Sequence, residues 1–229
     1  MNVKLDWHSD FLGICAYDDK IFPNHFHVDL HMVTQTENAR HQNIAFDRMK
    51  VIVNELFAHS IFVCYDNPLM KKLSEIYPEK MVVLPEEAYD QVVGIALYCK
   101  INAVLEKAIT CNRVRISSKF GEDVWYEYET GDALGPFAYG TKLKGRRKNT
   151  MPWWHRSDLM TFDALGDITV TTWEDLDLGW SGADTKNQTV LEFIPDKPAE
   201  VIDIRKERKE RKNKFNAEIV NGGKNTDED

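Results

Sequence analysis

Two alternating segments joined by a short turn constrain the fold more than any other feature of this sequence. Polar and apolar residues alternate in stretches from Val3 to about Tyr17 and again from Phe22 to about Thr36, with Asp18-Asp19-Lys20 between them. Alternation with a period of two is typical of a strand, and turn-forming residues between two strands indicate a hairpin. The sequence therefore predicts a β-hairpin in this region.

Two helices and a second hairpin are expected next. Apolar residues recur at three- and four-residue steps over residues 43–57, and a longer periodic segment runs from Pro85 to about Ala108. Between them, residues 60–77 are expected to form an irregular connection with a short helix over 69–76. Alternating segments at 113–117 and 124–129 flank Gly121-Glu122-Asp123, which predicts the second hairpin. Residues 1–130 are thus expected to form an α+β domain.

The remaining hundred residues have a different texture. Residues 131–202 are expected to form a β-rich extension, with strand candidates at 168–173 and 189–194. This extension wraps the core or a partner, or its tryptophans are buried against the first domain; they are Trp153, Trp154, Trp173 and Trp180. Residues 203–229 are dominated by charged and polar side chains, which predicts a flexible tail.

Charge and composition limit the possible partners. The basic run at 142–148 lies near Trp153 and has the character of a nucleic-acid contact, but 29 basic against 37 acidic residues give a net charge of −8. Because of this net charge we do not expect nucleic acid as a partner. We interpret the basic run as solvent-exposed charge. No apolar stretch approaches the roughly 18 residues that cross a membrane. We expect a cytoplasmic protein whose four separated cysteines are mostly free thiols.

A histidine-rich strand carries the strongest chemical signal. His25, His27, Asp29 and His31 share one face of the predicted second strand, because side chains alternate across a strand. Two imidazoles two residues apart can converge on one zinc ion, and His8 on the partner strand is placed to supply a third ligand. The alternative is a polar, solvent-facing strand that happens to be rich in histidine. His59 follows the first helix and alone would more often be structural than catalytic.

These segments resemble a known family. The order hairpin, two helices, hairpin, with H-x-H on the second strand, is similar to the tunnelling fold of the 6-pyruvoyl- and 6-carboxytetrahydropterin synthases. The matching positions are His25-Phe26-His27 for H-G-H, Ala45 to Lys50 for the helix start, Phe57-Ala58-His59 for L-D-H, and Pro85-Glu86-Glu87-Ala88 for P-T-x-E. The resemblance covers roughly residues 1–130. It implies zinc held by His8, His25 and His27, proton transfer by His59 and Cys15, a pterin-like substrate, lyase activity and a homo-oligomer.

The chain departs from that family at three positions, which leaves two functions open. Cys15 lies ten residues before His25 rather than a few, Ala58 stands where the family has aspartate, and Ser117-Ser118 replaces a pterin-anchoring glutamate. The retained histidines favour a zinc-dependent lyase that acts on a pterin or a purine-derived molecule. The losses favour a non-catalytic descendant that binds or regulates a partner through its C-terminal extension.

Overall fold

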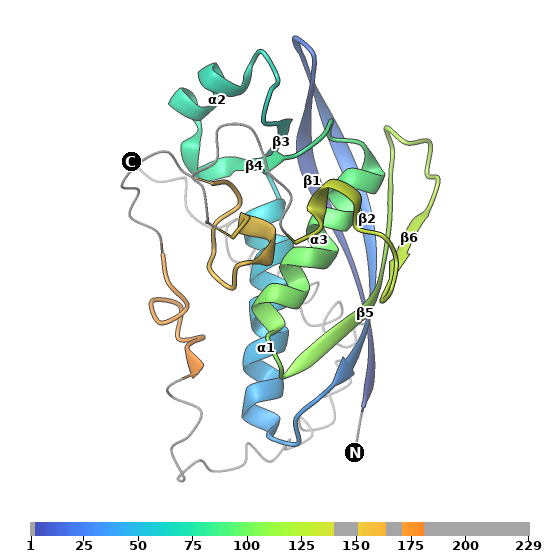
Figure 1. The fold of residues 1–229 in the computed structure, drawn as a ribbon, viewed down its shortest axis with the longest axis vertical. Coiled ribbons are helices and arrows are strands. Elements are labelled where there is room, and N and C mark those ends of the chain that lie inside the picture. Colours follow the sequence, from blue (N-terminus) through green and yellow to red (C-terminus); the bar gives the residue numbers. More distant parts are fainter. Residues whose placement is uncertain (1–2, 140–150, 164–170, 181–229) are drawn as a thin grey trace, which may run out of the picture. The chain divides into compact units, whose positions relative to one another are not determined.

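A computed structural model describes residues 3–139, 151–163 and 171–180. A six-stranded sheet in the order β4-β3-β1-β2-β5-β6 packs with helices on one side (Figure 1). The strands are β1 (Lys4–Tyr17), β2 (Lys20–Thr34), β3 (Ile61–Cys64), β4 (Met81–Leu84), β5 (Ile109–Ser118) and β6 (Tyr126–Glu129). The helices are α1 (Ala39–Val51), α2 (Met70–Ile76) and α3 (Asp90–Leu105). The α+β class predicted from the sequence is confirmed.

Both predicted hairpins are present. β1 pairs with β2 in an antiparallel register that places Tyr17 opposite Lys20, so that the turn has only two residues between the paired positions. β5 pairs with β6 from Arg113 opposite Glu129 to Ile116 opposite Tyr126. β5 also pairs with β2, which joins the two hairpins into one sheet.

The first helix begins earlier than the periodicity predicted. The side chain of Asn38 accepts hydrogen bonds from the backbone N–H groups of Arg40 (3.0 Å) and His41 (3.3 Å), which caps α1 ahead of its apolar stripe. A π-helical turn at Ile52–Phe57 continues α1, so the two elements together end where the sequence indicated. The longer predicted helix forms as α3, which begins at Asp90 rather than at Pro85.

Two short strands were not predicted. β3 pairs in parallel with both β1 and β4, and each of these added strands has four residues. β3 is buried throughout, and β4 is buried except for Val83. Such short apolar runs cannot be distinguished from helix or loop by periodicity alone, because they lack the polar-apolar alternation of a half-exposed strand.

The core lies between the helices and one face of the sheet. Phe26, Val28 and Leu30 of β2 are buried on this face, and α1 and α3 lie side by side against it (Figure 1). Gly94 permits the close approach of α3 to β5, since a Cβ atom there would come within 2.7 Å of the Ile116 side chain. The opposite face of β2 therefore carries the histidines, and no described helix covers it.

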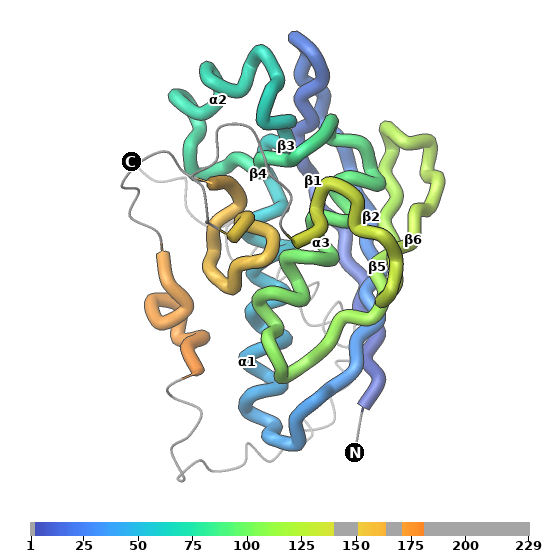
Figure 2. Tube along the Cα trace, in the orientation of Figure 1, coloured from blue at the N-terminus to red at the C-terminus, as the bar shows by residue number. Residues whose placement is uncertain are grey.

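Two described segments of the extension, drawn in amber and orange in Figure 2, contribute side chains to the hydrophobic core. Arg48 of α1 is almost fully buried, with its guanidinium 4.8 Å from the ring centre of Trp173 and 4.1 Å from that of Trp180. Trp153 and Trp154 are also buried. The basic run at 142–148, the strand candidate at 189–194, residues 168–170 of the candidate at 168–173 and the tail at 203–229 lie outside the described residues. The domain boundary at residue 130 stays a prediction.

Candidate metal centre

The uncovered face of the first hairpin carries a row of histidine–aspartate pairs across β1 and β2. The register places Asp6 opposite His31, His8 opposite Asp29, and Asp10 opposite His27. In each pair the histidine Nδ1 atom lies within 2.5–2.6 Å of an aspartate oxygen. A carboxylate on Nδ1 fixes the proton there and leaves Nε2 free to bind a metal ion or a proton.

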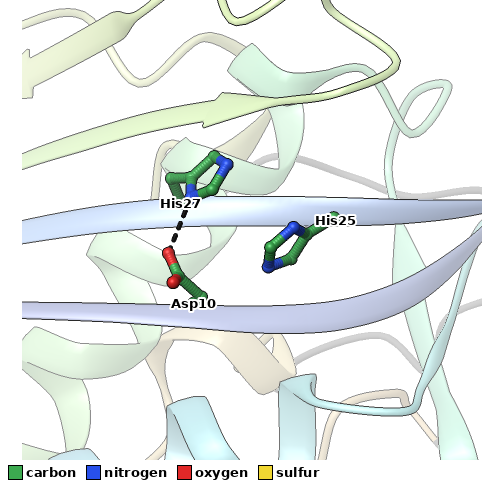
Figure 3. Close-up of side chains that lie close together, drawn as sticks. All are labelled: Asp10, His25 and His27. Carbon is green, nitrogen blue, oxygen red and sulfur yellow. Dashed lines mark hydrogen bonds and ion pairs between the residues drawn. The ribbon is translucent and has the colours of Figure 1, made fainter.

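One of these pairs is part of a cluster of potential metal ligands. Asp10, His25 and His27 each offer one ligand atom, and the three atoms lie within 4.8 Å of one another (Figure 3). The rings of His25 and His27 have their centroids 4.6 Å apart, and the Nδ1 atom of His27 lies 2.6 Å from Asp10. Two imidazoles and one carboxylate suit zinc, which commonly takes three protein ligands in catalytic sites and leaves a fourth position open. Asp10 serves either as the third ligand or as the carboxylate that orients His27.

The structure brings together two of the three histidines predicted as zinc ligands. His25 and His27 share the cluster, whereas His8 lies opposite Asp29, four residues along β2 from His25. His8 is nonetheless near the cluster, because it lines the same surface hollow as Asp10 and His27. Its role as a ligand stays a prediction.

That hollow has a volume of about 340 Å³, and its wall includes Trp125. The guanidinium of Arg115 lies 4.9 Å from the centre of the Trp125 ring. The same guanidinium is within 3.5 Å of Asp29 and 3.4 Å of Glu127, so its charge is already compensated. The hollow thus joins a metal-ligand cluster to an aromatic wall.

The two serines that replace the expected anchoring glutamate lie on opposite sides of the sheet. Ser117 is the register partner of His27, and its buried hydroxyl has no hydrogen-bond partner among the described residues. Ser118 instead donates to both carboxylate oxygens of Asp90 at the start of α3 (2.7 and 2.8 Å). Burial raises the pKa of Asp90, and the hydrogen bonds from Ser118 oppose that shift. Only Ser117 therefore adjoins the cluster.

His59 lies at the edge of the same region. Its backbone N–H donates to the carbonyl of Leu12 (2.6 Å), and Leu12 is the register partner of His25. Two strand spacings, about 10 Å, therefore separate the backbones of His59 and His25. His59 is exposed and has a φ of +60°, a left-handed conformation that is uncommon for residues other than glycine. Its catalytic role stays a prediction.

Cys15 lies on the other face of β1, in the hydrophobic core. Its side chain is fully buried, and this burial raises the pKa of the thiol to about 12. The thiol is therefore protonated near neutral pH, and thiolate is the form that acts as a base or nucleophile. The structure gives no support to the proton-transfer role predicted for Cys15.

Asp10 is the cluster residue that the sequence interpretation missed. Its position on the histidine face follows from strand alternation, but its place opposite His27 follows from the hairpin register. The signal that could have found it is the turn Asp18-Asp19, since a two-residue loop pairs Tyr17 with Lys20 and hence Asp10 with His27.

Similarity of this chain to known proteins is found among solved structures. No protein-family model matches the chain, and none of the curated proteins matches it. An uncharacterized protein, WS1659 from Wolinella succinogenes, is similar in structure with a TM-score of 0.42 and 11% identity, over 56% of this chain and 98% of that one. The 6-pyruvoyl tetrahydropterin synthases of Plasmodium vivax (TM-score 0.37, 9% identity, 57% and 98% covered) and Plasmodium falciparum (0.36, 11%, 56% and 98%) are similar too.

Proposed function

We propose that this chain is a divergent tetrahydropterin-synthase-like protein that binds one zinc ion through His25 and His27 with the help of Asp10. The observation that carries the proposal is the convergence of these three ligand atoms within 4.8 Å on an uncovered sheet face. As an enzyme it would be a lyase for a pterin or a purine-derived small molecule. Its resemblance to tunnelling-fold synthases further supports a homo-oligomer, and the sequence supports a cytoplasmic location.

Each residue of the site has a distinct task in this proposal. Bound zinc supplies a Lewis acid that polarises a substrate oxygen and acidifies a neighbouring C–H bond. Asp10 holds the Nδ1 atom of His27, so that the Nε2 atom of this ring is available to a metal ion. Ser117 offers its unpartnered hydroxyl to a ligand beside His27. His59 is the remaining candidate for moving a proton.

The alternative is a protein that binds or regulates without catalysis. Ala58 is apolar and buried, so it cannot polarise His59, and Cys15 is a buried neutral thiol. Ser117 has no charge with which to anchor the N–H donors of a pterin ring, and unpaired buried donors cost about 1–3 kcal/mol each. These features favour a retained metal site whose original chemistry has been lost.

Metal content tests the proposal directly. Purified without chelator or affinity-tag metal and supplemented with zinc, the protein should hold about one zinc ion per chain by elemental analysis, the stoichiometry of a single site. Replacement of both His25 and His27 by alanine should abolish binding and leave the circular dichroism spectrum unchanged. His31→Ala is the matched control, because His31 has the same kind of aspartate partner but lies outside the cluster. Zinc near zero in the unaltered protein would overturn the metal site.

A substrate assay separates the two functions. Dihydroneopterin triphosphate should bind weakly to the zinc-loaded protein and turn over slowly, because Ser117-Ser118 stands where the family has its anchoring glutamate. Turnover at the typical enzyme rate of about 1–10³ per second would establish the lyase and exclude the non-catalytic alternative. Binding without turnover would favour the alternative.

A further inference from the structure

Lys100 of α3 is a fully buried cation enclosed by one loop of the C-terminal extension. Its ammonium nitrogen donates to the backbone carbonyls of Trp153 (3.2 Å), Arg156 (3.0 Å) and Asp158 (2.6 Å). An ammonium group has three N–H donors, and each has a carbonyl here. A carboxylate oxygen of Asp158 lies 3.4 Å away, and the side chain of Lys100 has no exposed surface. The loop is therefore folded around this one charge.

The same segment covers one of the two edges of the sheet, the edge formed by β4. β4 is a terminal strand, and β3 is its only neighbour within the sheet. The outward N–H of Val83 donates to the carbonyl of Thr161 (2.9 Å), and the carbonyl of Val83 accepts from the indole of Trp153 (2.7 Å). The hydroxyl of Thr161 donates to the carbonyl of Met81 (2.5 Å). An uncovered edge would present these groups to any extended segment.

We propose that residues 153–163 form a cap over the edge of β4 and that the ammonium group of Lys100 is the latch that holds the cap in place. Without the latch, the carbonyls of the loop lose their common donor, and Asp158 loses one of its two cationic partners, the other being Arg156. The cap then leaves the edge, and the N–H of Val83 loses its partner. The exposed edge would accept an extended strand. In the intact protein the cap, residues 153–163, occupies this edge.

Other charged groups around the latch support its cationic form. Asp158 and Asp163 favour the charged ammonium, whereas Arg156 opposes it and is itself within 2.9 Å of Asp158 and 3.2 Å of Asp163. Asp158 thus contacts both cations, and loss of Lys100 removes one of these contacts.

Hydrogen exchange of individual amides in the full chain tests the latch. In Lys100→Ala the amide of Val83 should exchange faster by about tenfold or more, which corresponds to roughly 1.4 kcal/mol of local opening. The amides of Val82 and Leu84 point toward β3 by strand alternation and should keep their protection. Lys107→Ala, at an exposed position after α3, is the matched control and should change none of the three.

Chemical rescue shows whether charge is the cause. Propylammonium replaces the atoms that Lys100→Ala removes and should restore protection of Val83, whereas 1-propanol of the same size should not. Lys100→Met should show the same fast exchange but no rescue, because its side chain fills the space. Unchanged exchange at Val83 would overturn the proposal, as would equal acceleration at Val82 and Leu84. Equal rescue by propanol would overturn the role of the charge.

Discussion

A single carboxylate defines the candidate metal centre at the scale of residues. Three histidines face the uncovered side of β2, yet only His25 and His27 belong to a cluster in which a third ligand atom is within reach. Asp10 supplies this third ligand atom, because it is the register partner of His27 and lies within reach of His25 as well. Neighbouring pairs such as Asp6 with His31 have similar contacts but no third ligand among the described residues.

Asp10→Asn should therefore weaken zinc binding by about 10- to 100-fold, the usual effect of removing a carboxylate that binds or orients a ligand. The fold should tolerate the change, because exposed ion pairs contribute only about 0–1 kcal/mol to stability. A competition titration with a chelator measures the zinc affinity, and thermal unfolding measures the stability.

Asp6→Asn provides the comparison for that experiment, since it removes a like charge from the same face without touching the cluster. An equal loss of zinc affinity in both variants would mean that the overall negative charge of the face, rather than a defined ligand set, attracts the metal. Asp10 was not among the predicted site residues, although strand alternation puts it on the same face of β1 as His8. Its place beside His27 depends on a two-residue turn, whereas the expected turn also included Lys20.

At the scale of elements, the long periodic features were predictable and the short ones were not. Both hairpins and the helices α1 and α3 follow from alternation or three- and four-residue spacing. The strands β3 and β4 were not predicted, because a run of four mostly buried residues shows no alternation of polar and apolar side chains. Burial of the extension's tryptophans was one of the alternatives expected from the sequence, but the enclosure of Lys100 was not predicted, since this residue is polar within the apolar stripe of α3.

Lys100 should also give the protein a distinct pH dependence of stability. Burial lowers the pKa of this ammonium group to about 8 from its usual 10.5. Between these values the unfolded chain binds more protons than the folded one, so the contribution of Lys100 to unfolding free energy rises with pH. The contribution is constant below pH 8. Its total change is about 3 kcal/mol, from 1.36 kcal/mol per pKa unit.

Denaturant unfolding of the unaltered protein and Lys100→Met, at intervals from pH 7 to 10.5, measures this effect. The difference in unfolding free energy between the two proteins should move in favour of the unaltered one as the pH rises. Buried thiols such as Cys15 titrate in this range only in the unfolded chain, and they contribute equally to both proteins, so they cancel. A difference that is flat across the range would contradict the burial of a charged Lys100.

At the scale of the whole molecule, the described segments of the extension make contacts that stabilise the first 130 residues. Its segment at 151–163 satisfies the edge of β4 and encloses Lys100, and its segment at 171–180 encloses Arg48. Burial lowers the pKa of Arg48, and the nearby Glu106 opposes this shift. Lys100 and Arg48 both belong to helices within residues 1–130. Without the extension, these two buried cations would lose the groups that enclose them.

A chain that ends at residue 130 should consequently be much less stable than one that ends at residue 184, and it should self-associate. The shorter chain exposes the edge of β4, and open edges pair with one another. Sedimentation at several concentrations measures the association, and thermal unfolding measures the stability. Equal stability and the same association state in the two chains would confirm residue 130 as a domain boundary.

The alternation of histidine and aspartate across β1 and β2 also selects the register in which the two strands pair. A slip of two residues is the smallest error that keeps every side chain on its proper face. In one direction it would place His8 opposite His27 and Asp6 opposite Asp29; in the other it would place His8 opposite His31 and Asp10 opposite Asp29. Each misaligned hairpin sets like groups against each other, which disfavours it. The side chains that prepare a metal site thus also favour the alignment that places Asp10 opposite His27.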